Sequence, residues 1–222
     1  MIDTQLLRER RVKAEQRAHL AREVVETILL TALIFLVVHF SIQSRPVNTP
    51  SMEPGLQPQQ SIVVNSLAYL FSAPRRGDVI ILHHHHIPAD AADLANGCSV
   101  DSGTNGKFMT CDYVKRVIGI PGDTIQITPI QVIVDGVVLK EDKYIQVPTD
   151  VPPNGAVLGP VKLGTDQFFV LGDNRLNSTD SRFWPTPVLR QDIVGRVVMV
   201  FWPLNSVHWL PNESSVFDHV KQ

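Results

Sequence analysis

The sequence predicts a mainly β domain, an antiparallel folded sheet or open barrel, behind one N-terminal transmembrane helix. Two observations lead to this fold class. An apolar run without charged residues comes early in the chain, and short β-rich runs separated by Gly, Pro and Asp follow it. No convincing helix longer than one or two turns is visible between those runs, which is typical of antiparallel β folds.

The apolar run is the first element. Residues 27–44 contain no Asp, Glu, Lys or Arg, and a helix of these 18 residues would be about 27 Å long, enough to cover the hydrocarbon core of a bilayer. Basic residues outnumber acidic ones before the run, so the positive-inside rule places the N-terminus in the cytoplasm. We expect a cytoplasmic basic segment at 1–23, the transmembrane helix at 24–44 and an extracytoplasmic β domain at 45–222.

A cleaved secretory signal peptide is the alternative interpretation of this N-terminal region. The charged region before the apolar run is long, the run exceeds a signal-peptide core, and no Ala-x-Ala-like cleavage site follows it. The sequence therefore favours a retained single-pass anchor.

The strands come next in the chain. Alternating or continuous apolar runs predict them at 61–65, 78–83, 112–120, 123–127, 131–134, 137–139, 167–171 and 193–202. The dipeptide Asp135-Gly136 between two of these runs is the strongest hairpin signal. Residues 66–71 are the only candidate for a short helix, and the stretches 86–111 and 147–164 are expected to be long loops.

Composition narrows the class of function. Hydrophobic residues make up 44% of the chain, charged residues 19%, and the net charge is −2, which argues against a nucleic-acid partner. Cys98 and Cys111 are the only cysteines, and on this topology they lie outside the cytoplasm, where disulfides persist. A bridge between them would close a short loop and contribute about 3 kcal/mol. A reactive thiol or a metal-binding pair is the less favoured alternative.

Four consecutive histidines, 83–86, directly follow an apolar strand. A His-rich tract can bind metal, but neighbouring residues of a strand point to opposite faces, so at most two of the four could share one ion. We interpret the tract as a solvated strand end and expect neither a metal site nor a cofactor.

The candidate chemistry begins at Ser51, a few residues beyond the apolar run and therefore near the bilayer surface. The histidines are badly placed to serve as its base, although a hidden Ser-His-Asp triad stays possible. Lys115 lies inside an apolar strand and could act as a base if burial lowered its pKa from about 10.4 to near 7, a demand of about 4.6 kcal/mol. From spacing alone, the favoured interpretation is that Lys115 points outward and pairs with a carboxylate.

Four sequence motifs favour a different interpretation of Lys115. Residues 51–54 read Ser-Met-Glu-Pro, 76–79 Arg-Gly-Asp-Val, 115–123 Lys-Arg-Val-Ile-Gly-Ile-Pro-Gly-Asp, and 172–182 Gly-Asp-Asn-Arg-Leu-Asn-Ser-Thr-Asp-Ser-Arg. Their order behind one apolar span resembles that of the bacterial type I signal peptidases, a family of serine/lysine dyad peptidases. The resemblance extends from the span to about Pro203.

The resemblance implies roles for individual residues. Ser51 matches the family nucleophile and Lys115 the general base. Ser178 matches the serine whose hydroxyl orients that lysine, and Thr49 falls where the family has a hydroxyl that helps the backbone N–H of the nucleophile to bind the oxyanion.

The resemblance also implies a supporting layer. Asp180 and Arg182 match a pair that supports the site beneath the catalytic residues, and Arg116 follows the lysine as the family expects. Met52 and Ile118 are our guesses for the lining of shallow pockets that select small substrate residues.

The implied function is removal of signal peptides from exported preproteins outside a bacterial plasma membrane. The expected partners are signal-peptide-bearing preproteins and the lipid bilayer, with functional coupling to the protein export machinery. Two alternatives stay open: another Ser/Lys protease, such as a self-cleaving repressor, and a non-catalytic, membrane-anchored β domain that binds a partner.

Overall fold

The computed structural model describes residues 19–36, 42–86, 98–100, 109–145 and 157–221. The chain divides into two compact units, Met1–Ser41 and Ile42–Gln222. Residues 19–36 of the first unit form a helix, and its Arg22 contacts Glu26 at 2.7 Å. No helix among the described residues combines the length and apolar character needed to cross a membrane. Residues 1–18 and 37–41, which belong to the predicted cytoplasmic segment and span, lie outside the described residues.

The predicted end of the span at Ser44 is not correct. Residues Ile42–Pro46 form strand β1, which pairs antiparallel with β2 (Ser61–Asn65), so that Ile42 lies opposite Asn65. A strand bonds its backbone to a neighbour rather than to its own preceding turn, so a helix cannot include these residues. Any helix that precedes β1 ends before Ile42.

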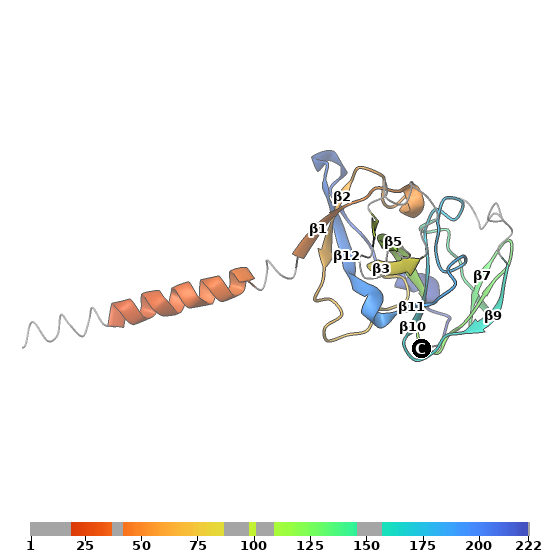
Figure 1. Cartoon of the computed structure of the whole chain (residues 1–222), viewed down its shortest axis with the longest axis horizontal. Helices are drawn as coiled ribbons and strands as arrows, with labels where there is room; N and C mark the ends of the chain where they lie inside the picture. Colours follow the sequence, from red (N-terminus) through yellow and green to blue (C-terminus); the bar gives the residue numbers. More distant parts are fainter. Residues whose placement is uncertain (1–18, 37–41, 87–97, 101–108, 146–156, 222) are drawn as a thin grey trace, which may run out of the picture. The chain divides into compact units, whose positions relative to one another are not determined.

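The second unit consists of two antiparallel sheets in the part of the chain that the structure describes, which confirms the prediction of a mainly β domain (Figure 1). The larger sheet has the strand order β1-β2-β12-β3-β5-β10-β11, with β4 beside β5 and β13 beside β12. The bounds of its remaining strands are β3 Val79–His86, β4 Ser99–Val100, β5 Met109–Gly119, β10 Gln167–Leu171, β11 Val188–Leu189, β12 Ile193–Trp202 and β13 His208–Trp209. The smaller sheet has the order β8-β7-β6-β9, with β6 Thr124–Ile127, β7 Val132–Val134, β8 Val137–Val138 and β9 Leu158–Lys162.

Three predicted strands, 61–65, 167–171 and 193–202, match β2, β10 and β12 at both ends. The predicted hairpin is also present: Val134 lies opposite Val137, and the turn residues Asp135 and Gly136 have φ angles of 48° and 79°. Positive φ at both central residues is what a tight hairpin turn of this kind needs, and it explains why Asp and Gly stand there.

The predicted loops contain more strand than expected. β3 continues through the four histidines and pairs with β5, so the tract forms the end of this strand, three residues beyond the predicted bound at 83. The stretch 86–111 includes β4 and the start of β5, and 147–164 includes β9, which pairs with β6. Residues 66–71 form turns, not a helix. In each strand the long-range pairing partner overrides a local composition that favours loops.

Three hydrophobic clusters hold the described part of the domain together. One fills the curve of the larger sheet and contains Met52 and Leu56, each 1% exposed, packed with Ile62, Ile81 and Val200. A second joins β5 and β10 to the smaller sheet, and a third lies around β3 and β10. Because Met52 directly follows Ser51, the first cluster anchors the segment that carries the candidate nucleophile.

Candidate active site

Ser51 lies in a short 3-10 helix, η1 (Pro50–Met52), shortly after β1. Its backbone is fixed from two directions. Met52 anchors it to the hydrophobic cluster beneath, and the N–H of Asn174 donates a hydrogen bond to the carbonyl of Ser51 at 3.0 Å. The Asn174 side chain also donates to the carbonyl of Pro50 at 3.2 Å and to Glu53 Oε2 at 3.3 Å. The loop after β10 therefore holds the segment that carries Ser51.

Lys115 lies on β5, opposite Ile80 of β3, and its side chain is 1% exposed. Its Nζ is 2.8 Å from Ser51 Oγ and also donates to the carbonyl of Val114 at 3.0 Å. Among the described residues, no carboxylate lies within ion-pair distance of this ammonium group. The outward, ion-paired lysine favoured by spacing alone is therefore wrong.

The surroundings of Lys115 lower its pKa below that of an exposed lysine. Burial lowers the pKa of Lys115 from 10.5 to about 8, with Arg182 acting in the same direction and Asp180 and Asp173 opposing it. Desolvation penalises the charged form because the buried ammonium loses its hydration. A lysine with this pKa is partly neutral near pH 7 and can accept a proton from a neighbouring hydroxyl.

Thr49 stands two residues before the first motif, and Ser178 stands in the last one. The Thr49 Oγ1 is 3.3 Å from Ser51 Oγ. The Ser178 hydroxyl donates to Asp180 Oδ2 at 2.7 Å, and neither of the described hydrogen bonds of Lys115 goes to Ser178. A Cβ at Gly172 would collide with the Ser178 hydroxyl and would lie 2.5 Å from the Ser51 carbonyl. Glycine at this position lets the two serine-bearing segments approach each other.

Ion pairs of buried arginines surround the site. Arg182 donates to both carboxylate oxygens of Asp180, at 2.8 and 2.9 Å. Arg116 donates to both oxygens of Asp173, at 2.8 and 2.7 Å, and to the carbonyl of Gly77. Paired, bidentate guanidinium groups of this kind fix two segments relative to each other.

Two further residues in this layer were not singled out from the sequence. Arg175 donates to Glu141 at 2.9 and 2.6 Å and to the carbonyl of Gly172 at 2.9 Å, so it ties the loop after β10 to the segment after β8. Arg175 stands in the 172–182 motif, which could have drawn attention to it. Glu141 lies in none of the four motifs, and no local pattern marks it.

A groove of about 230 Å³ runs beside Ser51. Its lining residues are Arg45, Pro46, Val47, Asn48, Thr49, Ser51, Met52, Ile81, Asp112 and Val114. Met52 lines it, as we guessed. Ile118 does not: it is fully buried in the cluster between β5 and the smaller sheet. Four residues of strand, about 13 Å, separate Ile118 from Val114, which carries it past the end of the groove.

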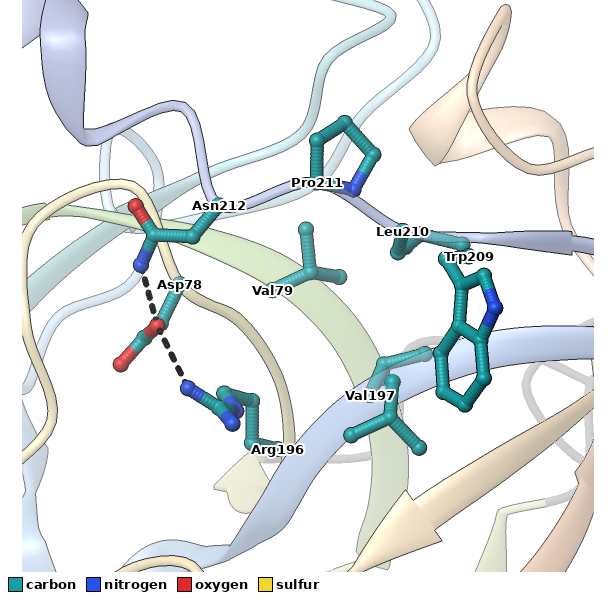
Figure 2. Close-up of a pocket in the computed structure, with 9 residues that line it drawn as sticks. Asp78, Val79, Arg196, Val197, Trp209, Leu210, Pro211 and Asn212 are labelled. Carbon is teal, nitrogen blue, oxygen red and sulfur yellow. Dashed lines mark hydrogen bonds and ion pairs between the residues drawn. The ribbon is translucent and has the colours of Figure 1, made fainter.

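A second cavity of about 250 Å³ lies elsewhere on the domain (Figure 2). Figure 2 shows Asp78 between Asn212, which donates to it at 2.5 Å, and Arg196, 3.8 Å away, with Trp209 at the other end. Neither Ser51 nor Lys115 lines this cavity, so the groove beside Ser51 is the candidate active site.

The two cysteines and the histidine tract lie near the far end of β5. A disulfide joins Cys98 to Cys111. The Nδ1 atom of His83 lies 2.5 Å from Asp112 Oδ1. No group of three or more potential metal ligands is present in the described part of the chain.

Comparisons with known proteins agree with the motifs. The family model described as "Signal peptidase, peptidase S26" matches residues 20–202. A signal peptidase I of Leptolyngbya laminosa is 39% identical over 82% of this chain and 80% of its own length. A probable signal peptidase I-2 of Synechocystis sp. is 31% identical over 86% of this chain and 78% of its own length. A crystal structure of a signal peptidase I from Enterococcus faecalis covers 56% of this chain and 97% of its own, with 22% identity and a TM-score of 0.33. The resemblance inferred from the motifs is thereby confirmed, and the chain belongs to the signal peptidase family, peptidase S26.

Proposed function

We propose that this chain, a serine endopeptidase of the signal peptidase family, removes signal peptides from preproteins with Ser51 as nucleophile and Lys115 as general base. The observation that carries the proposal is the 2.8 Å contact between Lys115 Nζ and Ser51 Oγ in a site where the lysine is 1% exposed. A serine hydroxyl needs a neutral base within hydrogen-bond reach, and burial supplies one.

The reaction follows from these positions. Neutral Lys115 takes the proton of Ser51 Oγ, which attacks the scissile carbonyl carbon and forms a tetrahedral intermediate. The backbone N–H of Ser51 and the Thr49 hydroxyl donate to its oxyanion. Protonated Lys115 then gives its proton to the leaving amine, and the acyl-enzyme remains. Lys115 next deprotonates a water molecule, which hydrolyses the ester and restores both side chains.

Ser178 orients Lys115 in this proposal, but as an acceptor. Its hydroxyl proton is committed to Asp180 Oδ2, and a hydroxyl still has lone pairs that can accept an N–H of the lysine. Asp180 is held in turn by Arg182. Asp180 and Arg182 therefore act through Ser178, and Arg116 acts through Asp173 in the segment that also bears Asn174.

The substrate lies in the groove between β1 and β5 as an extended chain. Both strands have an edge there that can pair with a third strand, the usual mode of extended-peptide recognition. The groove has a volume of about 230 Å³ and its lining includes Met52 and Ile81, which fits small apolar side chains near the cut.

We further propose that the apolar segment from Val24 to the residue before β1 anchors the chain in the plasma membrane with its N-terminus in the cytoplasm. The absence of charged residues from 27 to 44 and the basic residues at 1–23 support this topology. Along the chain, Ser51 follows β1 closely and therefore also follows the proposed anchor closely, which suits a substrate whose apolar segment lies in the bilayer.

The decisive experiment is cleavage of a preprotein in detergent by the full chain and by Ser51→Ala and Lys115→Met. Both variants are expected to lose at least about a thousandfold in rate, because members of a catalytic dyad act as a unit. Ser72→Ala and Lys162→Met, on the exposed surface, are the matched controls and should cut like the wild type. Wild-type rates in both dyad variants would contradict the mechanism, and no cleavage by the wild type would favour a binding domain.

A further inference from the structure

An ion pair spans the groove at some distance from Ser51. Arg45 Nη1 of β1 lies 3.6 Å from Asp112 Oδ2 of β5, and both residues line the groove. Three strands, β2, β12 and β3, separate β1 from β5 in the sheet order. The sheet therefore curves back until its edge strand faces β5, and the Arg45–Asp112 pair bridges the two walls.

The pair lies at a defined distance from the dyad. Asp112 precedes Lys115 by three residues on β5, which is about 10 Å of strand. An extended substrate advances by nearly the same amount per residue. If the residue before the scissile bond lies beside Lys115, the fourth residue before the bond lies beside Asp112.

The direction of the substrate follows from connectivity, and here the inference rests on the proposed function. Along the chain, β1 begins directly after the segment that we propose to span the membrane. The apolar part of a signal peptide precedes the cleavage site and also lies in the bilayer. Substrate residues that precede the cut therefore extend toward Arg45 and Asp112 rather than away from them.

The charges at this point of the groove are balanced and accessible. The Arg45 and Asp112 side chains are 42% and 38% exposed, so a substrate can reach both. Arg45 also donates to Gln43 at 3.3 Å, and Asp112 also contacts His83. The opposite charges of Arg45 and Asp112 cancel.

We propose that Arg45 and Asp112 determine specificity by selecting an uncharged substrate residue at the fourth position before the cut. An uncharged side chain passes the pair without separating it. A charged side chain of either sign can bind one member only by leaving the other without its partner. The pair thus disfavours both signs, whereas a single charge in its place would favour the opposite sign.

The test uses three matched peptides with Ala, Lys or Glu at the fourth position before the cut, and kcat/KM for each. For the wild type, Ala is expected to be the best substrate and the Lys/Glu ratio close to one. Asp112→Asn leaves Arg45 alone and should shift the ratio about two- to fivefold toward Glu, the range typical of exposed ion pairs. Arg45→Gln should shift it toward Lys, by less, because His83 still faces Asp112.

Controls separate a local effect from net charge and from a general failure of the mechanism. Lys140→Gln and Asp142→Asn change the net charge by the same amounts on exposed residues outside the groove. A second set of peptides, with Ala, Lys or Glu at the fourth position after the cut, probes the other side of the scissile bond. Both controls should keep the wild-type ratio. An unchanged ratio in Asp112→Asn, or equal shifts in the controls, would overturn the specificity role while cleavage of the Ala peptide upholds the proposed function. No cleavage of the Ala peptide would overturn both.

Discussion

Buried cationic side chains have different hydrogen-bond partners in two regions of the domain. Four buried arginine side chains, those of Arg76, Arg116, Arg175 and Arg182, are each paired with a carboxylate at N···O distances of 2.8 to 2.9 Å. Beside Ser51, Lys115 is as deeply buried but contacts a hydroxyl and a carbonyl. Burial alone would lower the pKa of Arg175, but Glu141 raises it above the usual value, whereas burial dominates at Lys115.

The difference separates the charges that hold segments of the chain together from the one that can become neutral and act as the proposed base. A paired arginine stays charged at any accessible pH and fixes two segments. An unpaired buried lysine is costly, and that cost is what makes its neutral form available. Substituting one residue of each group tests this difference.

The largest effect is expected from breaking a buried pair. Arg175→Met leaves the Glu141 carboxylate buried without its cation and removes a hydrogen bond to Gly172, so the free energy of unfolding should fall by about 3–5 kcal/mol. Denaturant unfolding of the full chain in detergent measures it.

Two variants make this result specific. The exposed Arg75→Met should cost less than about 0.5 kcal/mol. The double variant Arg175→Met, Glu141→Met should recover part of the loss, because no buried charge is then left unpaired. A loss below about 1 kcal/mol in the single variant would mean that the ion-paired layer is not structural.

At Lys115, by contrast, removing the charge is expected to stabilise the fold. At pH 7, Lys115→Met should raise the free energy of unfolding by about 1–3 kcal/mol, because methionine fills the site without a charge to desolvate. The folded pKa of about 8 lies below the unfolded value of 10.5. The cost of the charge is therefore complete below pH 8 and fades as pH rises from there to 10.5.

The pH dependence of stability tests whether the gain in the free energy of unfolding comes from the buried charge. The stabilisation by Lys115→Met, measured by denaturant unfolding, should shrink between pH 8 and pH 10.5, whereas exposed Lys162→Met should change little at any pH. A variant that is less stable than the wild type at pH 7 would contradict the comparison between the two regions.

The sequence motifs contain Ser51 and Lys115 and also the paired residues Arg116, Asp180 and Arg182, whereas Glu141 stands in none of them. Ser51, Lys115 and the 172–182 loop stand in motifs with a recognisable order, and the strands with strong apolar patterns matched the structure. Glu141 carries no local signal because its partner, Arg175, lies 34 residues away. The strands β9 and β1 were missed for a related reason: each is defined by its pairing partner, and the local composition suggests a loop and a helix end.

Activity should follow the protonation of Lys115. Because the neutral amine is the proposed base, kcat/KM should fall about tenfold per pH unit below an apparent pKa of about 8 and level off above it. A pH profile with an uncharged peptide measures this limb. A rate that stays constant down to pH 6 would point to a different base.

The smallest expected effect tests whether the charges of Asp180 and Arg182 also change the pKa of Lys115. The negative charge of Asp180 raises the pKa of Lys115 and the positive charge of Arg182 lowers it. Asp180→Asn removes the first and leaves the second, so the acid limb of the pH profile should move to lower pH by less than about one unit. Asp142→Asn, on the exposed surface, should leave the limb in place. A shift to higher pH would mean that Asp180 acts on the lysine by anchoring Ser178 rather than by its charge, and the two regions would then be coupled through geometry alone.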